Sequence, residues 1–409
     1  MAGTALDKTE MQARLMVAAC TLMITMGFGV IVNVAVFLTP LAAEFGWARA
    51  DLSLAYSVAT VATGIGGIVM GLLADRLPVR PLLVCCAVIP GIALFMLSHM
   101  TSTAELYGWH LLLGLFGVGA LMSPLNALAG QWFHRNPGFA IGIVSAGGAL
   151  GQGLGPFIAR QLVLAGGWRQ AYVILAIGYL AVMLPLALYI RNAPRASAAL
   201  AAANVPKFKD SPAWLLGWLC VAVVFCCMCM ATPIMHVAAL GSDRGLGATG
   251  SAGLLATMMV CGMAGRVAFG RLADRFGNLV AYIIASAGQT ALAFMFPFAP
   301  GTLSLYVLSG IFGVVFSGAM TAFILCAREY APAGRTAMAI GIVLFFAWGG
   351  MALGSWQGGL FFDICGTYTV SFVNASLGGV ANLAVLALLY WRTTGGSLPQ
   401  LPWRRAEAR

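Results

Sequence analysis

Charged residues are scarce in this sequence, since only 8% of its 409 residues are Asp, Glu, Lys or Arg. A soluble globular domain carries about 25%. Hydrophobic residues make up 61% of the chain, and no soluble core could bury so much apolar surface. The apolar stretches also exceed the ~20 residues that a helix needs to cross a bilayer. The composition therefore excludes a soluble protein and predicts a single all-α membrane domain surrounded by lipid.

The sequence also lacks the patterns of a metal site, an enzyme or a nucleic-acid-binding protein. Its ten cysteines show no metal-ligand spacing, and those at 226, 227 and 229 lie in an apolar run, where cysteine acts as a small hydrophobe. No nucleophile and base occur in a catalytic arrangement, so we expect no enzyme, cofactor or metal. The net charge of +10 comes from basic residues in short loops between spans, which is typical of topology signals. We expect no nucleic-acid partner.

Twelve transmembrane spans are predicted, six on either side of one polar linker at 191–211. The expected spans are 15–40, 51–73, 80–99, 106–131, 138–162, 169–190, 212–240, 248–271, 279–298, 303–327, 336–361 and 367–391. This predicts an N-terminal six-helix bundle over 1–190 and a C-terminal bundle over 212–409. The apolar segment after Arg14 is longer than that of a signal peptide, so we expect no cleavable leader.

The distribution of Lys and Arg predicts the orientation in the membrane. With both termini in the cytoplasm, 17 of the 22 basic residues fall on the inner side and four on the outer side. The positive-inside rule favours this arrangement strongly. We therefore expect a multi-pass protein of the cell inner (plasma) membrane. The one remaining basic residue, Arg266, falls inside a span.

The two halves of the chain are internal repeats. A shift of 199 residues places residues 71–76 (GLLADR) on 270–275 (GRLADR), and 140–144 on 339–343, both of which read AIGIV. The same shift places Gly151 and Gly155 on Gly350 and Gly354. This predicts two homologous six-helix bundles related by an axis along the membrane normal, with substrate bound between them near the midplane.

The G-x-L-A-D-R pattern after spans 2 and 8 resembles the signature of the major facilitator superfamily, and the resemblance covers the whole chain. Within that superfamily the sequence is most similar to the monocarboxylate transporters and the bacterial oxalate/formate exchangers. The residues that carry this similarity are 44–49 (EFGWAR), Trp132, Phe133, Arg135, Gly138, 140–142, Pro233, His236 and Arg266. Many bacterial facilitators share the W-F-x-x-R pattern and the G-W-R-x-A pattern, which is found here at 167–171.

Arg266 is the main candidate for binding substrate. An arginine within a span costs about 2.5–3.5 kcal/mol on insertion scales. Arg266 lies eight residues before Asp274, which is about 12 Å along a helix. Because a long side chain can just cover that distance, the alternative is a structural arginine that snorkels to the headgroups. All twelve acidic residues fall in loops or at span ends, and the repeat places Gly67 at the equivalent position. The resemblance implies that Arg266 binds a carboxylate.

Two features depart from the animal monocarboxylate transporters that the chain resembles. Those proteins have an aspartate four residues before the arginine, where this chain has Gly262, and a lysine in span 1, where it has Val32 and Asn33. The departures put a proton relay of the animal type in doubt. If protons are coupled, His236 in span 7 is the intramembrane group that titrates near neutral pH.

Further polar or amphipathic side chains in the spans are candidates for lining the substrate cavity. They are Asn33, Tyr56, Asn126, Trp348 and Gln357. The alternative for each, and for His236, is packing or an interhelical hydrogen bond.

A second set of candidates would gate transport without touching substrate. Asp75 with Arg76, and Asp274 with Arg275, are expected to form charge and helix-end contacts that close the cytoplasmic side. Gly151, Gly155, Gly350 and Gly354 are expected to let helices approach closely, either in static packing or in rocking contact between the halves.

These observations predict a secondary transporter for a small organic anion, such as the monocarboxylates lactate and pyruvate, that works by alternating access. Transport would be coupled to a proton or to a counter-anion, and we expect a monomer in the lipid bilayer. The alternatives are an exporter of drug-like or amphipathic metabolites and an oxalate/formate-type dicarboxylate exchanger. A dicarboxylate would require a second cation, which the spans do not offer. A membrane sensor would require an added signalling domain.

Overall fold

The computed structural model of the protein describes residues 2–47, 49–133, 136–194 and 208–395. Helices make up most of this part of the chain, and no strand occurs in it. Eleven of the helices are long and apolar enough to cross a membrane. One of these, α7 (Pro137–Tyr189), has 53 residues and is broken at Gly167, where φ is 79°. A straight helix of that length would far exceed a bilayer, so α7 supplies two spans. The predicted all-helical fold with twelve spans is confirmed.

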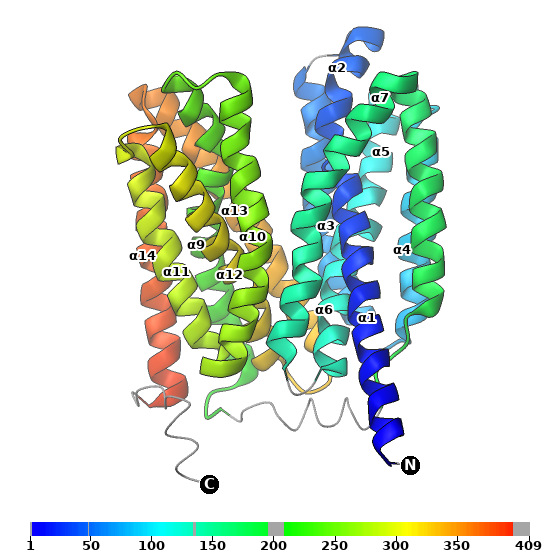
Figure 1. Cartoon of the computed structure of the whole chain (residues 1–409), viewed down its shortest axis with the longest axis vertical. Coiled ribbons are helices and arrows are strands. Elements are labelled where there is room, and N and C mark those ends of the chain that lie inside the picture. The colour runs from blue at the N-terminus through cyan, green and yellow to red at the C-terminus, as the bar shows by residue number, and fades with distance from the viewer. Residues whose placement is uncertain (1, 48, 134–135, 195–207, 396–409) are drawn as a thin grey trace. The chain divides into compact units, whose positions relative to one another are not determined.

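The chain forms two compact units (Figure 1). Unit 1 comprises Met1–Arg135, Ile143–Ala203 and Ala333–Phe345, and unit 2 comprises Asn136–Gly142, Asn204–Pro332 and Phe346–Arg409. Helices α7 and α13 (Thr336–Cys365) therefore each begin in one unit and continue in the other. The predicted bundles, 1–190 and 212–409, placed each of these helices wholly in one bundle. In the structure the start of α7 belongs to unit 2 and the start of α13 belongs to unit 1. Most of the predicted linker, 195–207, lies outside the described residues.

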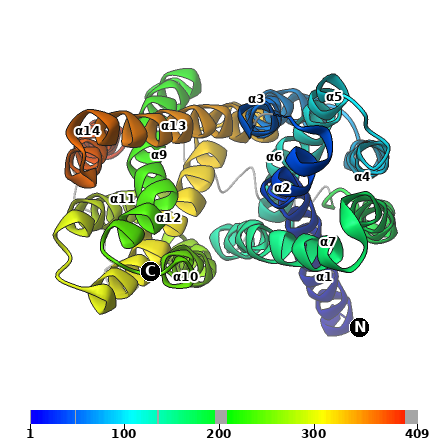
Figure 2. The ribbon, with the colours of Figure 1, turned by 90° about the horizontal axis from the view of Figure 1, so that it is seen from above.

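Unit 1 is built mainly from the first half of the chain. Its elements are α1 (Ala2–Ile31), α2 (Val34–Phe45), α3 (Arg49–Ala74), α4 (Val79–Leu97), α5 (Thr103–Leu113), a π-helical segment (Gly114–Val118), α6 (Gly119–Trp132) and most of α7. Figure 2, which looks along the helices, shows α6 close to α1 and α3, and α6 contacts both. Nearly all of the side chains of α6 are buried, so the core of this unit lies around α6.

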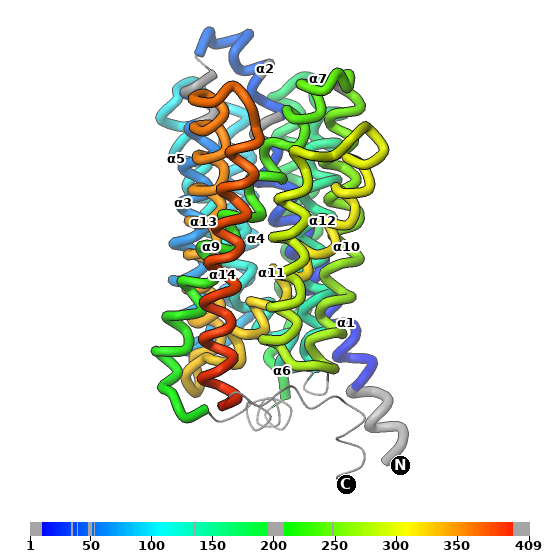
Figure 3. Tube along the Cα trace, turned by 90° about the vertical axis from the view of Figure 1, so that its left-hand side faces the viewer, coloured from blue at the N-terminus to red at the C-terminus, as the bar shows by residue number. Residues whose placement is uncertain are grey.

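Unit 2 repeats this plan with the second half of the chain. Its elements are α9 (Pro212–Asp243), α10 (Ala248–Phe276), α11 (Asn278–Met295), a short 3₁₀ turn (Phe296–Phe298), α12 (Thr302–Glu329), most of α13, and α14 (Tyr368–Thr394). The central helix is α12, which contacts α9, α10 and α11. Figure 3 shows α14 along the outside of α9 and α11, and α14 contacts both.

Two spans that were predicted as continuous helices are interrupted. Span 1 was expected over 15–40, but α1 ends at Ile31 and α2 starts at Val34, with a turn at Val32 and Asn33. The run Val30-Ile31-Val32 is β-branched and asparagine competes for backbone hydrogen bonds, which weakens a helix locally. Span 4 contains the π-helical segment, with a non-helical backbone at Gly117. Such segments inside α-helices occur frequently at functional sites.

Candidate functional site

Arg266 lies on α10 in unit 2 and is 3% exposed. It is the only Asp, Glu, Lys or Arg side chain that is buried in the described part of the chain. Its Nη2 atom lies 3.6 Å from Sδ of Met320 on α12. The guanidinium is therefore held inside the unit rather than extended to the end of the helix, which argues against the snorkelling alternative.

Small residues on α10 bring α12 close to Arg266. A Cβ atom on Gly265 would lie 2.1 Å from the backbone oxygen of Val314, and one on Gly262 would lie 2.4 Å from Oγ of Ser317. Ser317 and Met320 are one turn apart on α12 and face the same stretch of α10. The Ser317 hydroxyl is buried and has no hydrogen-bond partner among the described residues. Sequence reasoning missed both residues, because neither type stands out in an apolar helix.

His236 on α9 is half-buried, and its ring makes specific contacts within unit 2. Its Nε2 atom lies 3.1 Å from the backbone oxygen of Ser355 on α13, and its ring centroid lies 5.3 Å from that of Tyr368 on α14. These contacts fit the packing alternative for His236, while its role in transport stays a prediction.

Gln357 is a node of interhelical hydrogen bonds in unit 2. Its Nε2 atom donates to Oγ1 of Thr232 at 2.6 Å and to the backbone oxygens of Gly354 and Ser371, both at 3.3 Å. Its Oε1 atom accepts from Nδ2 of Asn374 at 3.0 Å. The side chain is 5% exposed, so its polar groups are used to join α9, α13 and α14. This is the interhelical alternative.

The remaining cavity candidates differ in their surroundings. Asn126 is fully buried in unit 1 and bonds to the backbone oxygen of Met122 and to Oγ of Ser145. Asn33 is 3% exposed at the break of span 1, and neither polar atom of its side chain has a partner among the described residues. Tyr56 on α3 is 40% exposed, and Trp348 on α13 is half-buried. Of these residues, Asn33 retains the most unused hydrogen-bonding capacity.

The two repeated aspartates cap the two helices that change units. In unit 1 the carboxylate of Asp75 accepts from the backbone N–H of Ala337 at 3.0 Å and of Met338 at 2.8 Å, in the first turn of α13. In unit 2 the carboxylate of Asp274 accepts from Gly138 at 2.7 Å and Phe139 at 2.8 Å, in the first turn of α7. Both contacts stabilise a helix N-terminus, where negative charge is favourable.

The two caps differ in one detail from the sequence prediction. Asp75 follows the end of α3, as expected for a loop residue, but α10 continues to Phe276 and includes Asp274. Burial raises the pKa of the Asp75 carboxyl, and the hydrogen bonds from Met338 and Ala337 offset this only in part. No described acidic residue forms an ion pair with Arg76 or Arg275, so the hydrogen bonds at these two helix starts come from the aspartates.

The glycines predicted to gate transport pack helices inside each unit. A Cβ atom on Gly155 would lie 2.2 Å from the backbone oxygen of Gly29 on α1, and one on Gly151 2.2 Å from that of Thr25. In unit 2, Gly350 and Gly354 lie in the same way against Val224 and Met228 of α9. These contacts fit the static-packing alternative, and a role in rocking stays a prediction.

Comparison with known proteins agrees with this architecture. The profile described as Major Facilitator Superfamily matches residues 17–355, most of the chain. The chain belongs to this superfamily. Solved facilitators share the fold: a variant of the E. coli fucose:proton symporter FucP has a TM-score of 0.71 at 14% identity, over 91% of this chain and 97% of that one. The proton:xylose symporter XylE also has a TM-score of 0.71, at 15% identity over 91% and 95%.

The characterised relatives are distant in sequence. Monocarboxylate transporter 13 of Rattus norvegicus is 26% identical over 376 residues, which cover 88% of this chain and 85% of the relative. The riboflavin transporter RibJ of Trypanosoma brucei brucei is 30% identical over 127 residues, covering 31% of this chain and 23% of RibJ. The predicted membership of the superfamily is confirmed. The facilitator fold is that of a multi-pass membrane transporter, a class of proteins that are not enzymes.

Proposed function

We propose that this facilitator is a secondary transporter for a small organic anion, specifically a short monocarboxylate, with Arg266 as the group that binds the carboxylate. The single observation that carries the proposal is the burial of the Arg266 guanidinium in the middle of α10. A buried cation within a span is costly, and in membrane proteins such a residue usually marks a substrate or ion pathway.

The chemistry around Arg266 favours a substrate with one charge and a short apolar tail. A guanidinium presents a planar set of donors that matches the two oxygens of a carboxylate. Met320 lies beside it on α12, and Met258 on α10 is buried two turns away along the same helix. No second buried Lys or Arg occurs in the described spans, as a dedicated dicarboxylate site would require. The distant monocarboxylate transporter 13 relatives agree with this substrate class.

Alternating access would be regulated at the two capped helix starts. In this proposal the contacts of Asp75 with α13 and of Asp274 with α7 form and break during the cycle. Coupling would be to a proton, with His236 as the candidate group, or to a counter-anion. The positive-inside pattern supports an inner-membrane protein with both termini in the cytoplasm.

The test is uptake of labelled lactate and pyruvate into proteoliposomes, with and without an inward proton gradient. We expect saturable uptake that Arg266→Ala abolishes. Arg266→Lys keeps the charge but loses the paired donors. Because a hydrogen bond to a charged group contributes about 1.5–3 kcal/mol, KM should rise by roughly tenfold to a hundredfold. Stimulation by the gradient would indicate symport, and dependence on internal anion would indicate exchange.

The matched control is Arg14→Ala, which removes an exposed arginine that pairs with Glu10 and should leave uptake unchanged. Folding of each variant is checked by its thermal transition. If folded wild-type protein takes up neither acid under any gradient, the monocarboxylate assignment is wrong. If Arg266→Ala transports normally, the assigned role of Arg266 is wrong and an exporter becomes the better hypothesis.

A further inference from the structure

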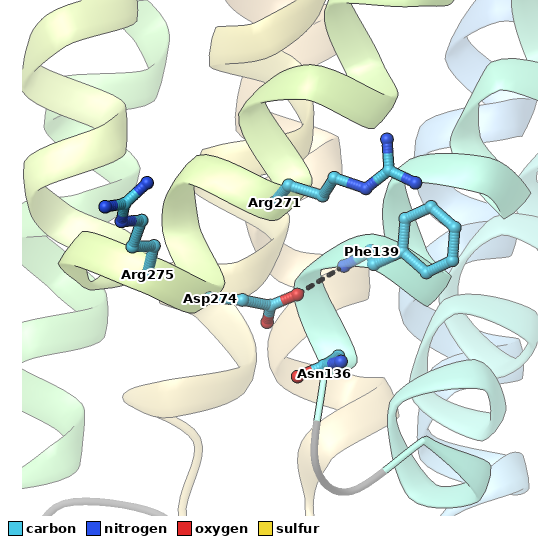
Figure 4. A pocket seen from close by; sticks show the side chains of 5 residues that line it. All are labelled: Asn136, Phe139, Arg271, Asp274 and Arg275. Carbon is cyan, nitrogen blue, oxygen red and sulfur yellow. Dashed lines mark hydrogen bonds between the residues drawn. The ribbon is translucent and has the colours of Figure 1, made fainter.

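Unit 2 contains a basic pocket at the end of α10, separate from Arg266. Its volume is about 430 Å³, within the range of small-molecule sites. The residues that line it are Asn136, Phe139, Arg271, Asp274 and Arg275 (Figure 4). Neither the transport proposal nor the capping of α7 explains why this pocket carries Arg271.

The charges in the pocket are not neutralised internally. Both oxygens of Asp274 already accept hydrogen bonds from the backbone of α7. The ion pairs in the described part of the chain lie elsewhere, at Arg14, Arg169 and Arg392. Arg271 and Arg275 therefore give the pocket two cationic side chains against one carboxylate that is already hydrogen-bonded, so it keeps a net positive charge. Their guanidinium groups lie on opposite sides of Asp274 and point away from its carboxylate (Figure 4).

The internal repeat shows that Arg271 is not needed for the helix cap. The shift of 199 residues places Leu72 at the position of Arg271, yet Asp75 caps α13 in the same way as Asp274 caps α7. Arg275 has an equivalent in Arg76 and lies in the last turn of α10, where a cation is favourable. Arg271 is thus an addition to one of the two repeats.

The pocket positions this added arginine. Cζ of Arg271 lies 4.4 Å from the centre of the Phe139 ring. Figure 4 shows the two side chains next to each other, with Arg275 on the other side of Asp274. Such a cation–π contact limits the motion of the guanidinium while its N–H groups stay available. The amide of Asn136 adds donor and acceptor groups to the same pocket.

We propose that this pocket binds a phosphate-bearing anion, which is the phosphate of an acidic lipid headgroup or of a soluble phosphate ester. Guanidinium groups match the geometry and charge of phosphate oxygens. The cavity is larger than a phosphate ion and leaves space for the group that the phosphate carries. The last turns of α10 lie at the end of a membrane span, and basic pockets at this level bind lipid headgroups.

The experiment uses the full-length, delipidated protein and has two arms. In the first, native mass spectrometry compares binding of phosphatidylglycerol with that of phosphatidylcholine of the same chain length. In the second, inorganic phosphate is titrated and its binding followed by ³¹P NMR. A basic residue near an anionic surface contributes about fivefold to binding affinity. The double variant Arg271→Gln with Arg275→Gln should therefore bind the anion about 25-fold more weakly.

The control is Arg80→Gln, at the start of α4, whose Nε donates to the backbone oxygen of Ile190 at 3.5 Å. Sequence places Arg80 on the same side of the membrane but outside this pocket. If the double variant, but not Arg80→Gln, loses binding of phosphatidylglycerol, the site is supported with a lipid as its ligand. Loss of phosphate binding alone supports it with a soluble ligand. The proposal is overturned if neither form of phosphate binds more weakly to the double variant than to Arg80→Gln.

Discussion

Replacing Asp75 by alanine removes both acceptors that hold the first turn of α13. In the structure its two carboxylate oxygens are 3.0 and 2.8 Å from the backbone nitrogens of Ala337 and Met338. Gly71 packs at the same place, since a Cβ atom on it would lie 2.5 Å from the backbone oxygen of Ala337. Asp75→Ala therefore leaves two backbone N–H groups without their acceptors at a close helix crossing.

The expected cost follows from these contacts. Loss of a helix cap costs about 0.5–2 kcal/mol, and a buried donor left without a partner costs about 1–3 kcal/mol. Together we expect the docked start of α13 to lose about 2–3 kcal/mol. At 1.4 kcal/mol per factor of ten, its backbone amides should exchange roughly 30- to 100-fold faster. Asp75→Asn keeps an acceptor and caps almost as well, so its effect should be under about tenfold.

Hydrogen–deuterium exchange of peptides covering residues 336–345 measures this directly. Asp210→Ala serves as the control, because it removes an aspartate that pairs with Arg392 and does not touch α13. Unchanged exchange in Asp75→Ala would refute the capping argument. Equal effects of the alanine and asparagine variants would show that charge, rather than an acceptor oxygen, holds this helix start.

Three further changes test separate contacts. Gly155→Ala should lower the free energy of unfolding by about 1–3 kcal/mol, because its Cβ would lie 2.2 Å from the backbone oxygen of Gly29. The control is Gly153→Ala, whose Cβ has open space and should leave the free energy of unfolding unchanged. Thermal unfolding of the two variants measures the difference. Gln357→Ala should cost about 1–3 kcal/mol through lost interhelical hydrogen bonds and change the substrate KM less than Arg266→Lys does; a large KM change would restore Gln357 to the substrate site. Burial raises the pKa of Asp75, so the docked state binds its proton more tightly. The proton-linked part of the docking free energy is therefore present below the ordinary pKa of aspartate and is lost as pH rises to the raised value, while the two cap hydrogen bonds remain above it. Exchange at 336–345, corrected for intrinsic rates, should increase over that pH window in wild type but not in Asp75→Asn.

The helices could be predicted closely because lipid imposes a strong rule on sequence. A span must be long, apolar and helical, and the predicted span 336–361 differs from α13 (Thr336–Cys365) by only four residues at one end. The breaks inside spans were missed, because the turn at Asn33 and the π-helical segment at Gly114–Val118 carry no charge and lie in spans that stay strongly apolar on average. Prediction therefore succeeded where the solvent decides the structure and failed where local backbone geometry does.

The candidate site was only partly predictable for a similar reason. A charge within a span stands out in sequence, so Arg266 could be found, whereas its neighbours Ser317 and Met320 are ordinary residues of an apolar helix. Asn126 and Gln357 also stand out, but the structure uses their side chains inside a unit. Sequence identifies which residues are polar, and only the fold shows which of them already have partners.

The internal repeat places Arg266 at a close helix crossing. In unit 1, a Cβ atom on Gly341 of α13 would lie 2.2 Å from the backbone oxygen of Gly67 on α3. Under the shift of 199 residues, Gly67 corresponds to Arg266 and Gly341 corresponds to Gly142. A Cβ atom on Gly142 of α7 would lie 2.6 Å from the backbone oxygen of Arg266. Arg266 thus occupies a position that the duplicated fold uses for close backbone contact, two turns from the Asp274 cap on the same helix. Any movement of the start of α7 against α10 must act on the backbone of Arg266, so in the proposed transport cycle this crossing would couple the anion site to the conformational change.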